Sequence, residues 1–479
     1  MKIGPSPIDA AYAASIKPIR NQMRKFDYQS LLNVMLVYLN EPVSDTKQEM
    51  QRLPWVVERL LIWLFADDTS QYKAKIAHES DLRKLIDLAW RNFDKVYSKD
   101  KKIQPRLFLR QAILPQAPYQ MGLDSHAYLL QLHLLSKLQN NSNLRIFLNQ
   151  KAGMPIDEYF EMGLLYWTHS INERPWFNST FVKNLSTAFP IEKQAIFLKS
   201  ISQPLAAFQT QLRSRTIKTD EWFQPTFFYK TPCIWQEAAA VPLGRPTLQR
   251  YFNSLIGDWI AESKMPDIRQ HYDSLIERYV GDSLTRGNLA FIPEVNLKAL
   301  LPQSKLVDFL VPDGDSIILI EVKNKALSIA VPASQEPLEI ASKLRQTILK
   351  AKRQLDAAEL ALRQDSKYAN KLFFRIVVTN NDLWINNAEL LIEDETQEPF
   401  TWLISLRELD MLTEITTKKE HSIASVLMQY AEKQKDSLSA SSSLEDFLQH
   451  QSLKPDQVPA HLLKYADAIF EKIADRLLL

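Results

Sequence analysis

The chain has 479 residues, too many for one ordinary hydrophobic core, and 46% of them are hydrophobic, which excludes disorder over most of its length. Its 58 lysines and arginines nearly balance 56 aspartates and glutamates, so no basic field of the whole chain is available for binding nucleic acid, and any such surface must be local. The single cysteine, Cys233, excludes an intrachain disulfide and a Cys-x-x-Cys zinc site.

Amphipathic helices are predicted throughout residues 1–220, because apolar residues recur there every three or four positions. The clearest stretches are residues 31–39, 82–97, 124–138, 156–167 and 191–201. The most apolar early run, residues 55–65, contains Glu58 and Arg59 and is far shorter than the ~20 residues of a membrane helix. We therefore expect a soluble, cytoplasmic protein with no membrane partner.

Strands and helices alternate beyond residue 221, which predicts an α/β core (α+β for the whole chain) with a mixed central sheet flanked by helices. Strands are expected at residues 226–235, 289–296, 306–311, 317–323 and 371–379, and helices at 247–262, 268–284 and 337–363. Only 9 glycines are present, which disfavours an all-β chain. A serine-rich linker at 436–443 and a short helical tail complete three expected domains, 1–220, 221–436 and 437–479.

The expected strand at residues 317–323 carries an acid and a lysine on one face. Side chains alternate along a strand, so Glu321 and Lys323 point to the same side, away from Ile320 and Val322. Burying an unpaired charge is costly, so both charges need compensation. A divalent cation together with a phosphate group would compensate both.

A second acid, Asp308, lies on the preceding expected strand. The turn signal at residues 312–315 predicts that the two strands form an antiparallel hairpin, with Asp308 roughly opposite Glu321. Two carboxylates a few ångströms apart repel each other unless a cation joins them. Such oxygen ligands suit Mg²⁺ or Mn²⁺.

The runs at residues 306–311 and 319–323, joined by a tight turn, resemble the PD-(D/E)XK (restriction-endonuclease-like) nuclease superfamily. The resemblance extends to the order helix, three strands, helix and strand over residues 268–379. One departure is Val307, which stands where the family motif has proline.

The resemblance implies roles for individual residues. Asp308 and Glu321 would be metal ligands, and the Val322 carbonyl would complete the metal shell. Lys323 would position the attacking water or stabilise the charge that develops on the phosphate. Glu277, on the first helix of the core, matches an additional acid of the family, although a solvated helix acid is the plain alternative.

Basic residues without an acid among them gather on the helix expected at 337–363. They are Lys343, Arg345, Lys350, Lys352 and Arg353. Of these, Lys343, Arg345, Lys350 and Arg353 are expected to bind nucleic-acid phosphates without reading sequence. Lys350 and Gln354 share a helix stripe with Lys343 and Thr347 that can border the site, and the resemblance makes Gln354 a catalytic candidate. A merely solvated face stays an open alternative.

The resemblance implies an endonuclease that depends on Mg²⁺, or on Mn²⁺, and acts on DNA. A looser similarity to bacterial phage-defence and mobile-element nucleases implies an antiviral role, with a partner protein subunit or a homodimer. Three alternatives remain open: a catalytically silent nuclease fold that binds nucleic acid or protein, a structural subunit, and a plain surface ion pair at Glu321 and Lys323. A second Glu-x-Lys at residues 262–264 shows that the tripeptide alone is not specific.

Overall fold

The computed structural model describes residues 7–43, 45–96, 115–116, 119, 125–171, 176–213, 219–222, 226–236, 238–300, 307–324, 342, 344, 346–380, 382–383, 385–389, 400–417, 421–435, 443–451, 453 and 455–478. Contacts between Cα atoms divide the chain into two compact units. Unit 1 comprises residues 1–128, 148–256 and 467–479, and unit 2 comprises residues 129–147 and 257–466. The domain limits expected after residues 220 and 436 stay predictions, and most of the serine-rich linker lies outside the described residues.

Unit 1 is mainly helical, as the periodicity predicted. Its helices and strands are α1 (Pro7–Met23), α2 (Tyr28–Asn40), α3 (Thr46–Arg52), α4 (Pro54–Ala66), η1 (Thr69–Gln71), α5 (Glu79–Val96), α10 (Ile156–Ser170), α11 (Ser179–Asn184), α12 (Ile191–Ile201), β1 (Ser202–Pro204), α13 (Leu205–Arg213), η2 (Thr219–Trp222), η3 (Phe227–Tyr229), β2 (Cys233–Gln236) and β3 (Ala239–Pro242). Helix α4 is buried along nearly its whole length and is the centre of this core, because its residues are apolar on every face.

A small sheet in the order β1–β2–β3 completes unit 1. The strand expected at residues 226–235 is therefore wrong over residues 226–232, because β2 begins at Cys233. Residues Phe227–Tyr229 form the short helix η3, in which Phe228 is buried against Phe65 and Phe208. Aromatic packing decides the local conformation there, and Pro232, which has no N–H for a sheet ladder, separates η3 from β2.

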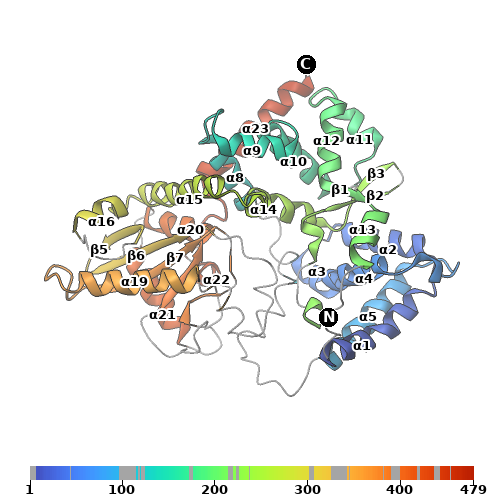
Figure 1. The fold of residues 1–479 in the computed structure, drawn as a ribbon, viewed down its shortest axis with the longest axis horizontal. Coiled ribbons are helices and arrows are strands. Elements are labelled where there is room, and N and C mark those ends of the chain that lie inside the picture. The colour runs from blue at the N-terminus through green and yellow to red at the C-terminus, as the bar shows by residue number, and fades with distance from the viewer. Residues whose placement is uncertain are drawn as a thin grey trace. The chain divides into compact units, whose positions relative to one another are not determined.

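Unit 2 is built on a five-stranded mixed sheet in the order β4–β5–β6–β7–β8 (Figure 1). Its elements are α15 (Pro266–Arg286), β4 (Ile292–Pro293), α16 (Glu294–Leu300), β5 (Phe309–Asp313), β6 (Ser316–Lys323), α19 (Ile348–Leu362), β7 (Leu372–Thr379), β8 (Thr401–Ser405), α20 (Leu406–Thr417), α21 (Ile423–Gln434) and α22 (Leu444–His450). Strands β4, β5 and β6 pair antiparallel, whereas β6, β7 and β8 pair parallel. The expected mixed sheet flanked by helices is confirmed.

Four helices span a unit limit in the chain or border it. They are α8 (His126–Ser136), α9 (Asn143–Ala152), α14 (Arg245–Ser263) and α23 (Ala460–Leu478). None of the helices in the described ranges is both long and apolar enough to cross a bilayer.

The two faces of the large sheet are covered by different helices. On one face Arg375 of β7 pairs with Asp356 of α19, and Arg375 stands beside Leu319 of β6. On the other face Phe309 of β5 lies against Gly281 of α15 and stands opposite Ile320 of β6. Because side chains alternate along β6, its odd-numbered residues, Glu321 and Lys323 included, face the α19 side.

The strand expected at residues 289–296 is mostly wrong. Only Ile292 and Pro293 pair with β5, and helix α16 begins at Glu294. Proline cannot donate to a sheet ladder, so β4 stops there. An acid in the first turn then suits the start of a helix.

Candidate active site

The hairpin of β5 and β6 has the predicted antiparallel pairing. Phe309 stands opposite Ile320 and Asp313 opposite Ser316, which leaves Gly314 and Asp315 as a two-residue turn. Gly314 adopts a φ of 58°, the left-handed conformation that this kind of turn requires and that glycine takes without strain. The strand expected at 306–311 begins only at Phe309, so Asp308 lies directly before β5 and not on it. Continuing the register by one residue brings Asp308 to the level of Glu321.

Asp308 is held at the open end of this hairpin by two hydrogen bonds. Its carboxylate accepts the backbone N–H of Val322 at 2.6 Å, and its carbonyl accepts the backbone N–H of Glu294 at 2.9 Å. Burial raises the pKa of Asp308, and the hydrogen bond from Val322 and the charge of Lys323 only partly oppose that effect. The carboxylate is therefore fixed beside the end of β6.

Glu321 and Lys323 lie together on one face of β6, as strand alternation predicted. The Lys323 ammonium forms an ion pair with the Oε1 atom of Glu321, whose side chain is only 2% exposed. The Oε2 atom of Glu321 is buried and receives no hydrogen bond from any described residue. Burial and the negative charge of Asp308 raise the pKa of Glu321 to about 7, so the ion pair does not fully offset its desolvation.

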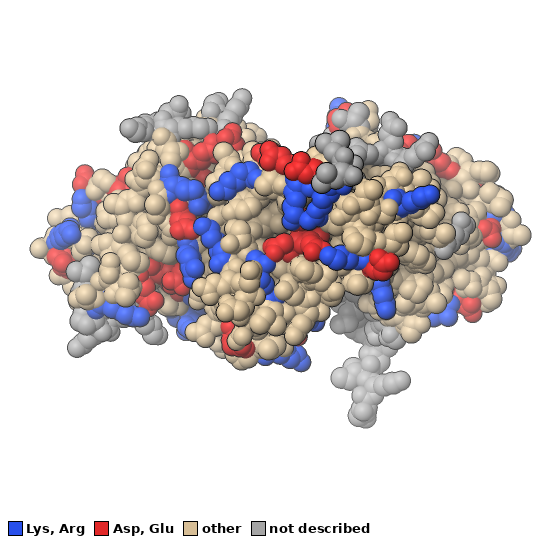
Figure 2. Space-filling view, turned by 90° about the horizontal axis from the view of Figure 1, so that it is seen from above, with Lys and Arg blue, Asp and Glu red and all other residues tan. Residues whose placement is uncertain are grey.

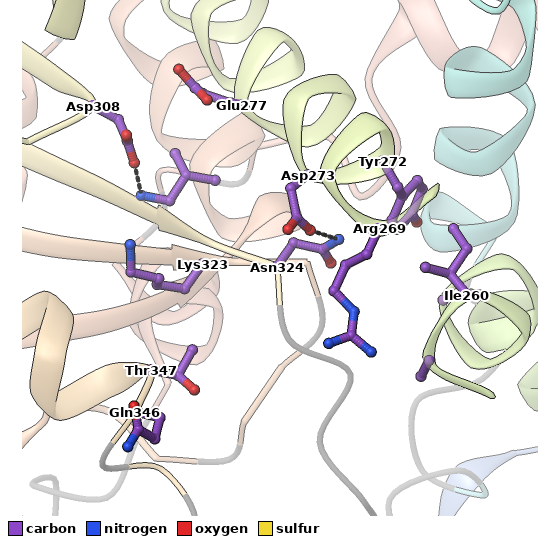
Figure 3. A pocket seen from close by; sticks show the side chains of 13 residues that line it. Ile260, Arg269, Tyr272, Asp273, Glu277, Asp308, Lys323, Asn324, Gln346 and Thr347 are labelled. Atoms are coloured by element: carbon purple, nitrogen blue, oxygen red, sulfur yellow. Dashed lines mark hydrogen bonds between the residues drawn. The ribbon is translucent and has the colours of Figure 1, made fainter. Parts of the chain in front are cut away.

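Glu277 extends the acid group from α15. It is half-buried, and its pKa is raised by burial and by the negative charges of Asp308 and Glu294. Figure 3 shows Glu277 and Asp308 at the same end of a cavity, with Lys323 beside them. Asp308 is thus close enough to both Glu277 and Glu321 for its charge to raise the pKa of each.

The cavity has a volume of about 560 Å³ and lies wholly within unit 2. It is lined by Gly257, Ile260, Ala261, Arg269, Tyr272, Asp273, Glu277, Asp308, Val322, Lys323, Asn324, Gln346 and Thr347. Glu321 does not itself line it, and reaches it only through the ion pair with Lys323. A ligand entering the cavity therefore meets Asp308, Glu277 and Lys323 directly.

The basic residues expected to border the site are not found among the described residues that line the cavity. Lys343 and Arg345 lie outside the described residues. Lys350 and Arg353 are exposed on α19 and Gln354 is half-buried, but none of these three lines the cavity.

Another residue of this basic run, Lys352, already interacts with acidic side chains. Lys352 pairs with Asp356 at 2.9 Å and lies 3.7 Å from Glu389. From this region the cavity receives Thr347, which belongs to the expected stripe, and Gln346.

Residues at the far end of the cavity were not found from the sequence. Asn324 follows Lys323 directly, and its Nδ2 atom donates to Asp273 at 2.8 Å. Arg269, Asp273 and Glu277 follow one another at four-residue intervals on α15, the spacing of one helix face. The spacing could have revealed two of these residues, because Asp273 and Arg269 lie one and two helical turns before Glu277 on the same face of the helix.

The residues present offer part of a metal site. In the described part of the chain no three His, Cys, Asp or Glu side chains are gathered closely enough to hold a metal ion. Asp308 and the unbonded Oε2 atom of Glu321 are nevertheless oxygen ligands of the kind that Mg²⁺ prefers, and Mg²⁺ usually keeps several waters beside one or two protein carboxylates. The donor set fits such an ion and does not fit a fully protein-bound zinc centre.

Comparison of the chain with protein-family models, with curated proteins and with solved structures finds no match.

Proposed function

We propose that this chain is a metal-dependent nuclease that hydrolyses phosphodiester bonds in DNA. The observation that carries the proposal is the meeting of Asp308, Glu321 and Lys323 at the end of β6, beside a cavity that a ligand can enter. The buried, unbonded oxygen of Glu321 supports it, because such an atom is costly unless a cation or a donor satisfies it.

Each residue has a distinct role in this proposal. Asp308 and Glu321 would hold the ion, with the Val322 carbonyl as a further ligand. When bound, Mg²⁺ supplies positive charge that stabilises the phosphate group during hydrolysis. The Lys323 ammonium donates hydrogen bonds to the phosphate oxygens, and the Glu277 carboxylate accepts a proton or a hydrogen bond from the attacking water.

The test is incubation of the full chain with supercoiled plasmid, linear DNA and RNA, each with Mg²⁺, with Mn²⁺ or with chelator. We expect nicking or cutting of DNA with either ion and none with chelator. Glu321→Ala and Lys323→Ala should each lower the rate about 100-fold or more, because each removes a charge that acts on the reacting phosphate. Cleavage that persists in chelator, or in Glu321→Ala, contradicts the proposal.

A matched control comes from unit 1. Glu79 and Arg83 form an exposed ion pair at 2.6 Å on α5. Glu79→Ala and Glu321→Ala each remove the acid of an ion pair. Glu79, however, is distant in sequence from the residues of the cavity and belongs to a different unit. Glu79→Ala should therefore leave the cleavage rate unchanged.

A second candidate function is a catalytically silent module that binds nucleic acid. The observation that favours it is the ion pair of Lys323 with Glu321, which already neutralises one of the proposed ligands. In that case no metal ion elicits cleavage, and DNA binds the wild-type chain and Glu321→Ala with equal affinity. Fluorescence anisotropy with labelled DNA, run beside the cleavage assay, separates the two functions.

A further inference from the structure

We propose that the far end of the same cavity binds one unpaired nucleotide next to the scissile phosphate, so that the substrate is a single strand or a frayed end. This inference rests on the proposed function and names the substrate class for it. It is carried by three features: an exposed cationic residue that forms no salt bridge with a described residue, a polar pair and an apolar wall, all lining one cavity (Figure 3).

The row Arg269, Asp273 and Glu277 sets the direction of the substrate along α15. The first and last of these residues are eight positions apart, about 12 Å along the helix axis. Glu277 lies beside Asp308 at the proposed scissile phosphate, so Arg269 lies about one to two nucleotides further along a bound strand. The cavity thus has a reacting end and a holding end.

Arg269 is suited to bind a phosphate. It is exposed and lines the cavity, and within the described ranges no salt bridge or hydrogen bond engages its guanidinium, although its charge partly opposes the rise that burial causes in the pKa of the nearby Asp273. Lys323, by contrast, is paired with Glu321. A guanidinium matches the two oxygens of a phosphate with parallel hydrogen bonds, so Arg269 is the residue of this cavity best placed to hold the strand.

Asp273 and Asn324 lie between the two ends and offer a different chemistry. Asn324 donates to Asp273 at 2.8 Å, and Asp273 is half-buried. A carboxylate repels a phosphate, so this pair does not contact the strand's backbone. A carboxylate and an amide together present acceptors and a donor to the polar edge of a base, an edge that is accessible only when the base is unpaired.

The wall opposite is apolar and has room beside it. Gly257, Ile260 and Ala261 share one face of α14, and a Cβ atom built on Gly257 would meet no other atom within 4 Å. The volume of about 560 Å³ falls in the range of sites for single small molecules. A base within an intact duplex is stacked and paired and cannot enter such a cavity, whereas an unstacked base can lie against the wall.

The charge on one face of the molecule agrees with local rather than broad contact there. On the face shown in Figure 2, basic and acidic side chains are interspersed. A protein that grips duplex DNA relies on a basic stripe along the backbone. A site that holds one nucleotide needs only a few charges at fixed places, such as Arg269.

The experiment uses the full chain and one labelled strand in three forms: single-stranded DNA, the same DNA in a blunt duplex, and single-stranded RNA. Cleavage is followed with Mg²⁺, and binding is followed by anisotropy with chelator. We expect a single strand to be bound and cut about tenfold better than the duplex. Arg269→Ala should lower kcat/KM on the single strand about tenfold, mainly through KM, because one hydrogen-bonded charge is lost.

Two variants sharpen the test. Gly257→Leu should fill the apolar end and weaken single-strand binding by a similar factor without lowering the thermal midpoint, since a helix accepts leucine well. Arg278→Ala is the matched control, because Arg278 is an exposed arginine of α15 nine residues from Arg269 and therefore on the opposite face. It should change neither binding nor cleavage.

The outcomes separate the two proposals. The nucleotide site is contradicted if the duplex is bound and cut as well as the single strand, or if Arg269→Ala and Arg278→Ala have equal effects. Neither result contradicts the proposed nuclease activity. Preferred binding of the single strand that depends on Arg269, without cleavage under any ion, supports the site and refutes the nuclease. A preference for the DNA strand supports both proposals, whereas a preference for the RNA strand supports the nucleotide site and contradicts DNA as the substrate of the proposed nuclease.

Discussion

Glu321 is a buried carboxyl group in the proposed active site, and its protonation affects the stability of the folded chain. In the metal-free chain its pKa is raised from 4.5 to about 7 by burial and by Asp308. The folded chain then holds a proton that the unfolded chain has released, so the free energy of unfolding falls as pH rises from about 4.5 to about 7. The full effect of such a shift is about 3 kcal/mol.

The measurement is urea unfolding in chelator at several pH values across this window. Glu321→Gln removes the titrating group, so its stability should depend less on pH and should exceed that of the wild type near neutral pH. Saturating Mg²⁺ should raise the thermal midpoint of the wild type, because an ion that binds only the folded chain stabilises it, and should leave Glu321→Gln unmoved. Parallel pH profiles for the two chains would contradict the assignment.

Residues of the site differ in how far the sequence reveals them. Glu321 and Lys323 follow from the alternation of a strand, and Asp308 follows from a turn signal and an antiparallel register. Arg269, Asp273 and Asn324 do not stand out, because an arginine or an acid on a half-exposed helix is ordinary in any sequence. Only the folded hairpin shows which face of α15 and which residue after β6 meet at a cavity.

At the scale of elements, two glycines in helices should respond to alanine in opposite ways. A Cβ atom on Gly163 of α10 would lie 2.5 Å from the ring of Phe252, which is fully buried and cannot move aside. Gly163→Ala should therefore destabilise unit 1 by about 1–3 kcal/mol through overpacking.

Gly257 of α14 is the matched case, because a Cβ atom built on it would have no other atom within 4 Å. Gly257→Ala should stabilise the chain by about 0.5–1 kcal/mol, the usual gain in a helix interior. Differential scanning calorimetry of the two variants decides the point. If both alanines raise the midpoint, close packing of α10 against Phe252 is not what requires glycine.

Elements whose apolar residues recur at one period were predicted correctly, and stretches without such a period were not. The helix expected at 337–363 is confirmed over Ile348–Leu362, and residues 346–347 form a turn before it. The helices of unit 1 and strands β6 and β7 have many apolar residues at one period, so their type is fixed by burial of one face or both. The stretches 226–235 and 289–296 are rich in aromatic and β-branched residues, which favour strands. Their conformation is set instead by tertiary packing of Phe228 and by proline at 293.

For the whole molecule, the division into units predicts the effect of a truncation. Glu161 of α10 is buried, and its partners are Lys472 and Arg476 of α23. Ending the chain after residue 466 should leave this carboxylate without a cation and cost unit 1 about 2 kcal/mol, less than a fully buried pair because both cations are partly exposed.

The measurement is differential scanning calorimetry, in which unit 1 should unfold at a lower temperature in the truncated chain than in the full chain. Adding Glu161→Gln to the truncated chain should restore part of the loss, since a neutral amide tolerates burial better than a lone charge. The same substitution in the full chain should destabilise it by leaving two cations unpaired. A truncated chain that melts like the full one would show that α23 adds little to unit 1.

The sequence also could not reveal how the units share the chain. A linear reading places domain limits where composition changes, near residues 220 and 436, and interleaved segments leave no such mark. Helix α14 has the pattern of one continuous amphipathic element, although its residues up to 256 belong to unit 1 and its residues from 257 belong to unit 2. Which residues form a unit depends on contacts between distant segments, and those contacts depend on the whole fold.

The interleaving has a consequence for the order in which the protein can be made. Unit 1 takes in residues 467–479, and unit 2 takes in residues up to 466. A ribosome delivers residues 308–323 long before these segments, so the hairpin with its acids can form early while its surroundings are still incomplete. Unit 2 is complete only once residue 466 has been made, so on shorter nascent chains the proposed cutting centre lacks part of its surroundings.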